Sequence, residues 1–279
     1  MSENRRAAVL GSPIAHSLSP VLHRAAYEQL GLRGWTYDRF EVDEAALPGF
    51  FKRLDEAGGP AWAGLSLTMP LKRAVIPLLD RITDTAASVE AVNTVVFTED
   101  GGRIGDNTDI PGMLAALRER GVERVERAAV LGAGATASSA LAALSRICAG
   151  EVTAYVRSDA RAAEMRQWGE RLGVAVRTAD WSDAAEAFRA PLVIATTPAG
   201  TTDALAAAVP ERPGALFDVL YDPWPTALAA AWSARGGAVV GGLDLLVHQA
   251  VLQVERMTGR APAPLAAMRE AGEAALAAR

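Results

Sequence analysis

Short apolar runs alternate with amphipathic segments along the whole chain. In the first third, the apolar runs predict strands at residues 7–10, 36–42, 62–67, 94–98 and 103–105. Segments with apolar residues at helical spacing predict helices at 20–30, 44–57 and 71–79. Asp100-Gly101-Gly102 between the last two strands is a hairpin signal. Strands that alternate with helices in this way are typical of parallel α/β layers.

The same alternation continues toward the C-terminus. It predicts strands at 130–131, 152–156, 174–177, 192–195, 215–219 and 238–240, with helices between them. Two apolar helices, at 243–257 and 264–278, end the chain with no strand after them. We therefore expect these two helices to return and pack on the first part of the chain.

A glycine-rich turn in the middle of the chain follows one of the predicted strands. The segment Gly132-Ala-Gly134-Ala-Thr-Ala137 comes after an apolar run and before a helical pattern. In this context a dinucleotide pyrophosphate lies on the helix N-terminus. Arg157 follows the next strand, where an NAD site carries Asp or Glu. An arginine there pairs with a ribose 2′-phosphate, so the pattern predicts NADP as the cofactor.

The mid-chain position of this turn predicts two α/β domains. Residues 1–105 are expected to form a mostly parallel substrate-binding and catalytic domain, completed by the C-terminal helices 242–279. Residues 106–241 are expected to form a Rossmann-like, doubly wound NADP-binding domain. Ligands on such sheets lie beyond the carboxyl ends of the strands, so two facing domains would leave a cleft for substrate and cofactor.

Composition excludes several classes of protein. The chain has 279 residues, 50% hydrophobic and 22% charged, which is ordinary for a soluble globular protein. A net charge of -5 provides no basic field for nucleic acid. The single cysteine excludes an internal disulfide, and the three scattered histidines show no metal-ligand spacing. Without a signal peptide or an apolar run of membrane-spanning length, we expect a cytoplasmic protein, monomeric or homodimeric, with small-molecule ligands.

Two serines lie between the first predicted strand and the first predicted helix. Ser19 before Pro20 is typical of a helix N-cap, and Ser17 is compatible with a solvated loop. Two hydroxyls beside free helix N–H groups also suit a small carboxylate. The residues alone leave both interpretations open.

A lysine and an aspartate are candidates for proton transfer. Lys72 falls in the first turn of a predicted helix, where a cation opposes the helix dipole, and local rules are often broken at functional sites. Asp109 is a natural N-cap, but beside Lys72 it would form a charge pair in a cleft. Asn93, before a neighbouring strand, adds an amide that can bind substrate hydroxyls. A solvated lysine and a simple helix cap are the alternatives.

Two further loops are expected at strand ends. Tyr221-Asp-Pro-Trp-Pro225 is stiffened by its prolines, and a rigid turn is the simpler interpretation. Gly241-Gly242 opens a helix and allows a ligand to approach the backbone closely. Gln249 is the polar exception in that helix, whereas His248 is interpreted as a packing or surface residue.

Together these motifs resemble the shikimate dehydrogenase family in its actinobacterial form, over about residues 9–264. The motifs that carry the resemblance are His16-Ser-Leu-Ser-Pro20, Thr68-Met-Pro-Leu-Lys72, Ala91-Val-Asn-Thr94, Gly105-Asp-Asn-Thr-Asp109, Tyr221-Asp-Pro-Trp-Pro225 and Gly242-Leu-Asp-Leu-Leu-Val-His-Gln249. The resemblance implies an oxidoreductase that interconverts 3-dehydroshikimate and shikimate with NADP(H), in chorismate and aromatic amino-acid biosynthesis.

The resemblance also implies roles for individual residues. Lys72 and Asp109 would form the catalytic pair, and no metal is implied. The implied substrate-binding residues are Ser17, Ser19, Thr68, Asn93, Asp109, Tyr221 and Gln249. The implied cofactor-binding residues are Gly132, Gly134, Ala135, Arg157, Ser158, Arg161, Thr196 and Gly242.

Two positions depart from the family pattern. Ser66 stands where many relatives carry asparagine, and the shorter side chain leaves its contact with the substrate open. Val156-Arg157-Ser158 replaces the usual Asn-Arg-Thr, which keeps NADP favoured but softens the discrimination against NAD. The nearest rival is a quinate or aminoshikimate dehydrogenase, which the paired serines disfavour. A non-catalytic NADP sensor and a folate-carrier dehydrogenase are more distant rivals.

Overall fold

The computed structural model describes residues 4–56 and 61–279, which divide into two compact units. The first unit comprises the chain up to Asp109 together with Leu246–Arg279, and the second is Ile110–Leu245. Both boundaries lie four residues after the expected ones, so Asp109 falls in the same unit as Lys72. Residue 57 of the predicted second helix and the first three residues lie outside the described part of the chain.

The first unit is built on a mixed sheet. Its strands are β1 (Arg5–Gly11), β2 (Trp35–Glu41), β3 (Ala61–Leu67), β4 (Arg81–Ile82), β5 (Thr94–Phe97) and β6 (Arg103–Asp106), in the spatial order β2-β1-β3-β5-β6-β4. Strands β1, β2 and β3 are parallel, whereas β5 runs antiparallel to β3 and β6. The hairpin signal before Arg103 is therefore confirmed.

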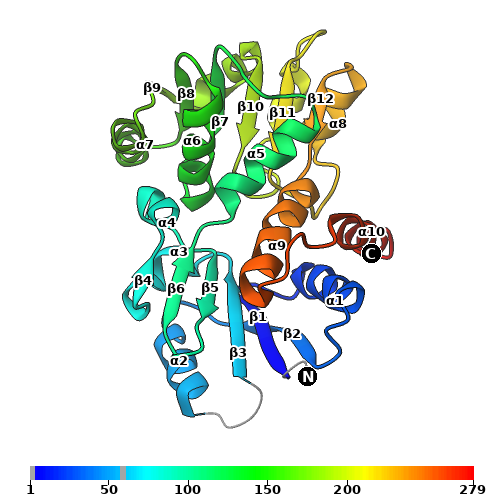
Figure 1. Ribbon diagram of the computed structural model, residues 1–279. Coiled ribbons are helices and arrows are strands. Elements are labelled where there is room, and N and C mark those ends of the chain that lie inside the picture. The colour runs from blue at the N-terminus through cyan, green and yellow to red at the C-terminus, as the bar shows by residue number, and fades with distance from the viewer. Residues whose placement is uncertain (1–3, 57–60) are drawn as a thin grey trace. The chain divides into compact units, whose positions relative to one another are not determined.

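Helices at both ends of the sequence complete the first unit. They are α1 (Ser19–Gln29), α2 (Leu47–Glu56), α3 (Leu71–Ala74), α4 (Asp84–Val89), α9 (Gly242–Thr258) and α10 (Leu265–Ala277), with a 3-10 turn at Ile76–Leu78. Helix α10 lies beside α1 (Figure 1). On one side of the sheet, buried residues that include Leu10, Leu65 and Phe51 form a continuous core.

Three local features of the first unit differ from the sequence prediction. The predicted helix at 71–79 stops at Ala74 and continues as a 3-10 turn, because Pro77 has no N–H for an α-helical bond. The short elements β4 and α4 were not predicted, and α4 is capped by the Thr83 hydroxyl, which accepts from the N–H of Ala86. Helix α1 begins at Ser19, so Ser19 is the first helical residue and not the N-cap.

The second unit has a fully parallel sheet. Its strands are β7 (Ala128–Leu131), β8 (Val152–Val156), β9 (Val176–Asp180), β10 (Leu192–Ala195), β11 (Ala215–Asp218) and β12 (Ala238–Val240). Their spatial order, β12-β11-β10-β7-β8-β9, is the doubly wound order of dinucleotide-binding folds. The four residues of β7, of β10 and of β11 are all buried, as expected where helices cover both faces of a parallel sheet. The predicted fold class is confirmed.

The remaining helices connect these strands. They are α5 (Asp109–Glu119), α6 (Ala135–Ile147), α7 (Asp159–Leu172) and α8 (Ala227–Ala234), with 3-10 segments at Trp181–Arg189 and Asp203–Ala208. Helix α6 follows the glycine turn and packs through small buried residues, among them Ala137 and Ser139. Within residues 4–56 and 61–279, no helix has the length and apolar character needed to cross a membrane.

Candidate active site

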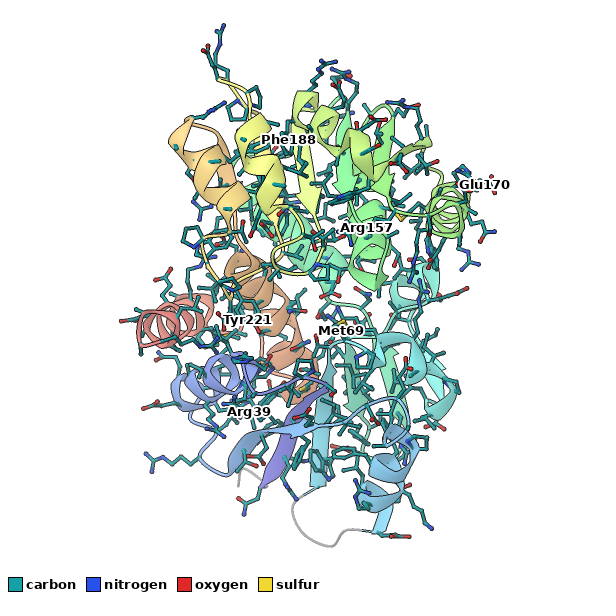
Figure 2. The ribbon with its side chains drawn as sticks, turned by 180° about the vertical axis from the view of Figure 1, so that it is seen from behind. Arg39, Met69, Arg157, Glu170, Phe188 and Tyr221 are labelled. Atoms are coloured by element: carbon teal, nitrogen blue, oxygen red, sulfur yellow. The ribbon has the colours of Figure 1, made fainter. Side chains whose placement is uncertain are left out.

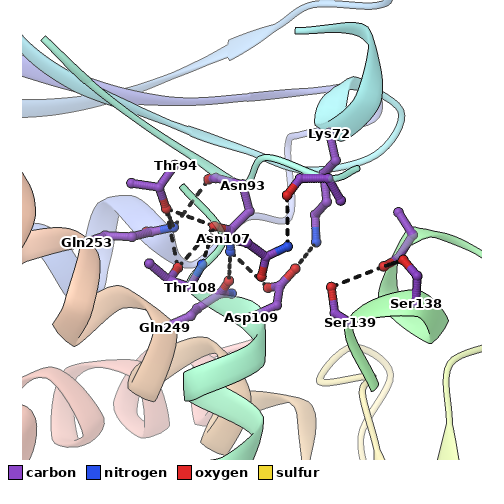
Figure 3. A network of polar contacts seen from close by, with 12 residues as sticks. Lys72, Asn93, Thr94, Asn107, Thr108, Asp109, Ser138, Ser139, Gln249 and Gln253 are labelled. Carbon is purple, nitrogen blue, oxygen red and sulfur yellow. Dashed lines mark hydrogen bonds and ion pairs between the residues drawn. The ribbon is translucent and has the colours of Figure 1, made fainter. Parts of the chain in front are cut away.

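A buried ion pair lies at the centre of the polar residues in the first unit. The Lys72 ammonium donates to Oδ2 of Asp109 over 2.5 Å (Figure 3). The two side chains are 14% and 3% exposed, respectively. Because a buried carboxylate without a partner is costly, the lysine and the aspartate fix each other in place. The structure therefore brings the two predicted catalytic residues together.

Backbone hydrogen bonds at the strand ends explain why these side chains meet. The carbonyl of Lys72 accepts from the N–H of Val92 over 2.8 Å, and the N–H of Leu67 donates to the carbonyl of Asn93 over 2.8 Å. Thr68 follows β3, and its N–H donates to the carbonyl of Leu10 over 3.0 Å. The segment that carries Lys72 is thus joined to the segment that carries Asn93.

Asn93 is the most extensively bonded side chain of this network. Its Nδ2 donates to Oδ1 of Asp109 over 2.9 Å and to Oε1 of Gln249 over 2.8 Å. Its Oδ1 accepts from the N–H of Thr108 over 2.8 Å and from the Thr94 hydroxyl over 2.9 Å. Both amide protons are used within the protein, so the orientation of Asn93 is fixed. Gln249 consequently turns its oxygen toward Asn93 and keeps Nε2 as a donor.

The segment before Asp109 is held by a second carboxylate. Asp106 accepts from the Thr83 hydroxyl over 2.6 Å and from the N–H of Asn107 over 2.8 Å. The guanidinium of Arg256, on helix α9, pairs with its other oxygen. This arrangement ties the loop that leads to Asp109 to both α4 and α9.

The serine loop lies at the start of α1. Ser19 is only 5% exposed, and its N–H donates to the Ser17 hydroxyl over 3.3 Å. Ser17 therefore supplies the oxygen near the helix start that the sequence led us to expect from Ser19.

Two aromatic groups near this loop are buried with polar atoms that have no hydrogen-bond partner in the described part of the chain. They are Nε2 of His23 and the hydroxyl of Tyr27. Nδ1 of His23 donates to the carbonyl of Ser19 over 2.9 Å, and its ring stacks on Tyr37 with centroids 3.9 Å apart. Burial disfavours the charged imidazole and lowers the pKa of His23 to about 4.

The glycine turn of the second unit has the geometry of a phosphate cradle. Gly132 has φ +114, and a Cβ there would lie 2.6 Å from the hydroxyl oxygen of Thr196, which itself donates to the Leu131 carbonyl. A Cβ on Gly134 would meet no atom within 4 Å, so the space before α6 is open. No side chain within the two described ranges caps this helix, which begins at Ala135. Its first N–H groups therefore fit a pyrophosphate.

The residues after β8 line a cavity of about 400 Å³. Arg157, labelled in Figure 2, is exposed there. Its guanidinium lies 5.1 Å from the centre of the Trp181 ring. Ser158 caps α7 by accepting from the N–H of Arg161. The donor chemistry of Arg157 and of Arg166, which also lines the cavity, fits a second phosphate.

The resemblance also gives Arg161 a cofactor-binding role, but its side chain pairs with another residue. Its guanidinium pairs with Glu164 of the same helix over 2.6 Å, and it does not line the cavity. Arg166 lines the cavity instead and donates to the Thr178 hydroxyl over 2.6 Å. The resemblance did not single out Arg166, although it lies nine residues after Arg157 on the next helix.

Tyr221 and Gly242 lie in the second unit, at the ends of β11 and β12. Tyr221 is part of the loop after β11. A Cβ on Gly242 would lie 2.2 Å from the Val219 carbonyl oxygen. The N–H of Gly242 donates to the Leu220 carbonyl over 2.9 Å. Packing against the protein backbone thus requires glycine here, whereas the sequence suggested only approach to a ligand.

Comparison with known proteins identifies the family. Residues 9–95 match the shikimate dehydrogenase substrate binding domain, and residues 242–271 match the shikimate 5′-dehydrogenase C-terminal domain. The shikimate dehydrogenase (NADP(+)) of Ruegeria sp. is 34% identical over 281 residues, which cover 97% of this chain and 99% of that protein. The chain belongs to the shikimate dehydrogenase family.

Solved structures of other shikimate dehydrogenases agree with this assignment. The shikimate dehydrogenase of Mycobacterium tuberculosis is 43% identical to this chain and superposes on it with a TM-score of 0.84. The match covers 99% of this chain and 100% of the other. The Thermus thermophilus enzyme, solved in complex with NADP(H) and shikimate, is 34% identical to this chain and has a TM-score of 0.82. The match covers 97% of this chain and 99% of the other. The resemblance inferred from the motifs is confirmed.

Three buried polar residues extend the network beyond the predicted site residues. The Tyr37 phenol donates to the Ser66 hydroxyl over 2.7 Å, and Ser66 donates to Oε1 of Gln253 over 2.8 Å. Nε2 of Gln253 then donates to the Thr94 hydroxyl over 3.1 Å. Gln253 follows Gln249 by one helical turn and so shares its face, which is the one signal that could have revealed it.

Proposed function

We propose that this protein catalyses the reversible NADP-dependent reduction of 3-dehydroshikimate to shikimate. The proposal rests on the buried Lys72–Asp109 pair and its 2.5 Å contact. An ammonium held by a carboxylate is positioned to give a proton to a carbonyl oxygen as that oxygen becomes a hydroxyl. In the reverse direction the same pair accepts the proton. Bound NADPH supplies the hydride.

The substrate would be held by the polar residues of the first unit, with help from Tyr221. We assign the carboxylate to Ser17 and Ser19, and the ring hydroxyls to Thr68, Asn93 and Gln249. Nε2 of Gln249 has no hydrogen-bond partner among residues 4–56 and 61–279, which supports a donor role toward one hydroxyl. The protein partners of Asn93 support a further role for it, which is to orient Asp109 and Gln249.

The cofactor would be held by the second unit. We assign the pyrophosphate to the turn formed by Gly132, Gly134 and Ala135, with Thr196 beside it. We assign the 2′-phosphate to Arg157 and Ser158, and add Arg166 because it lines the same cavity. The pairing of Arg161 with Glu164 supports a lesser role for Arg161.

A substrate panel tests the proposal and its nearest alternative. The purified protein is assayed in both directions with shikimate, quinate and aminoshikimate, or their keto forms, each with NADP(H) and NAD(H). The highest kcat/KM is expected for shikimate and 3-dehydroshikimate with NADP(H). A higher kcat/KM for quinate or aminoshikimate would support the paralogue instead. Binding of both ligands without hydride transfer would contradict the catalytic role.

A further inference from the structure

A buried carboxyl group lies at the carboxyl end of β11, in the second unit. Asp218 is 1% exposed, and among residues 4–56 and 61–279 it pairs with no cation and accepts hydrogen bonds instead. Burial raises the pKa of Asp218, and the hydrogen bonds oppose that shift. Because a buried carboxyl group costs folding free energy, one that is retained at a strand end is a candidate functional residue.

The two oxygens of Asp218 hold the loop that follows β11. Oδ1 accepts from the N–H of Leu220 over 3.2 Å, and Oδ2 accepts from the Thr226 hydroxyl over 2.7 Å. Thr226 is also the N-cap of α8, because its hydroxyl accepts from the N–H of Ala229 over 3.1 Å. One carboxyl group thus fixes the loop near its start and at its end.

Leu220 transmits this constraint to the start of α9. The carbonyl of Leu220 accepts from the N–H of Gly242 over 2.9 Å. A Cβ on Gly242 would lie 2.2 Å from the Val219 carbonyl oxygen and 2.6 Å from the Leu220 carbonyl oxygen, so the two backbones are in contact. Helix α9 therefore begins against the backbone that Asp218 holds, and a displacement of Leu220 would displace Gly242 as well.

These loops lie at the half of the sheet where the fold places the nicotinamide. This step rests on the proposed function, because it takes NADP(H) as the ligand. We assigned the 2′-phosphate to the segment after β8 and the pyrophosphate to the turn after β7. A dinucleotide on a doubly wound sheet extends across the point where the strand order reverses, which here lies between β7 and β10. The nicotinamide half consequently lies beyond the ends of β10, β11 and β12.

We propose that Asp218 is a positioning residue of the nicotinamide site, which holds Leu220 and Gly242 in the arrangement that receives the nicotinamide half of the cofactor. Its oxygens are buried and bonded to the loop, so Asp218 acts through the loop backbone and not by contact with the ligand. The adenosine half is assigned to other residues, after β7 and β8. Asp218 therefore governs the binding of one half of the cofactor and not of the other.

A fragment of the cofactor separates the two halves. Adenosine 2′,5′-bisphosphate carries the 2′-phosphate and the first phosphate of the pyrophosphate, but no nicotinamide. The Kd of this fragment and the Kd of NADPH are measured by calorimetry. Asp218→Ala is expected to raise the Kd of NADPH about tenfold and to leave the Kd of the fragment within about twofold of wild type. A role limited to the stability of the second unit would change both Kd values together.

Two variants of Thr226 repeat the test with a smaller change to the buried carboxyl group. Thr226→Val removes the hydroxyl that donates to Asp218, so the Kd of NADPH is expected to rise roughly threefold. Thr226→Ser keeps a hydroxyl and is expected to bind NADPH more tightly than Thr226→Val. The matched control is Asp203→Asn, because Asp203 is exposed and acts on Asp218 through its charge alone. Its Kd for NADPH should equal that of wild type.

The outcomes separate this inference from the proposed function. An Asp218→Ala variant that binds NADPH as tightly as wild type does, or that loses affinity for the fragment equally, overturns the inference. An equal loss in Asp203→Asn overturns it too, because charge and not the held loop would then be responsible. If thermal unfolding shows that Asp218→Ala does not fold, the ranking of the two Thr226 variants decides. A wild-type protein that does not bind NADPH overturns the proposed function together with this inference.

Discussion

The two units provide their candidate ligand groups in different ways. In the first unit, polar side chains are buried and bonded to one another, and Asn93 and Asp109 are 1% and 2% exposed. In the second unit, the candidate groups are the open end of α6 and the exposed side chain of Arg157. The first site is therefore shaped by side chains that fix each other, and the second by backbone geometry and surface charge.

This difference has consequences for mutation. A change in the first unit leaves a neighbouring buried group without its partner, which costs more than the contact that is lost. When an exposed side chain of the second unit is replaced, water can take its place beside the neighbouring groups, so little folding stability is lost. The main loss is then the contact with the bound ligand. We therefore expect substitutions within the buried network of the first unit to affect catalysis and stability, and substitutions of the exposed candidate ligand groups of the second unit to affect mainly cofactor binding.

The largest expected effect is at the ion pair. Lys72→Ala removes the proposed proton donor and leaves Asp109 buried without its cation, so kcat should fall about 10³-fold, within the range for general acid–base catalysis. The KM for 3-dehydroshikimate should change far less. Steady-state kinetics measures both values. Arg73→Ala, an exposed neighbour on the same short helix, is the control and should retain wild-type kcat. A Lys72→Ala variant with near-normal kcat would contradict the assigned role.

The contrast between the units also explains what could be predicted from sequence. The glycine turn and Arg157 could be singled out as candidates because a backbone-built phosphate site needs particular residues at fixed spacing along one segment. The fold class, the family and most strands were predicted for the same reason, since buried parallel strands such as β7 and β10 are continuous apolar runs.

The network of the first unit was harder to predict because its contacts join distant segments. Tyr37, Ser66 and Gln253 lie on three elements, and Ser66 and Gln253 are 187 positions apart. No local pattern marks a serine on strand β3 as the partner of a glutamine on helix α9. Short elements were missed for a related reason: β4 has two residues, too few for a periodic pattern.

The dependence of folding stability on acidic pH tests how completely the packing of the first unit buries its polar groups. His23 has a pKa of about 4 in the folded protein and 6.5 as the reference value, because burial disfavours its charged form. Between these pH values the unfolded chain binds a proton that the native protein does not, so stability falls as the pH falls through this window. The loss attributable to His23 should reach about 3 kcal/mol near pH 4.

Urea unfolding of His23→Phe between pH 4 and pH 7 measures this contribution. The variant keeps an aromatic ring against Tyr37 and should show a flatter dependence of unfolding free energy on pH than wild type. His16→Gln, a change at an exposed histidine, is the matched control and should keep the wild-type slope. Equal slopes in wild type and His23→Phe would mean that burial does not suppress the charge of His23.

Cofactor discrimination tests the exposed site of the second unit. Arg157→Ala should raise the KM for NADPH about 20-fold, within the range for hydrogen bonds to a charged group, and should affect NADH much less. The KM for 3-dehydroshikimate and the unfolding temperature should stay unchanged. Arg171→Ala is the matched control, because Arg171 also stacks on a tryptophan, Trp168, at 4.8 Å on helix α7. An equal loss with NADH and NADPH would argue against a 2′-phosphate contact.

The smallest expected effect separates backbone geometry from ligand contact within one turn. Gly134 has φ -93 and open space at its Cβ position, so Gly134→Ala should leave the unfolding temperature unchanged. The added methyl group would occupy the space where the pyrophosphate approaches, so the KM for NADPH should rise roughly fivefold. Gly132→Ala should instead lower the unfolding temperature, because φ there is +114 and Thr196 is in the way. If Gly134→Ala binds NADPH as well as wild type does, the cofactor does not lie on this turn, and backbone geometry does not shape the site of the second unit.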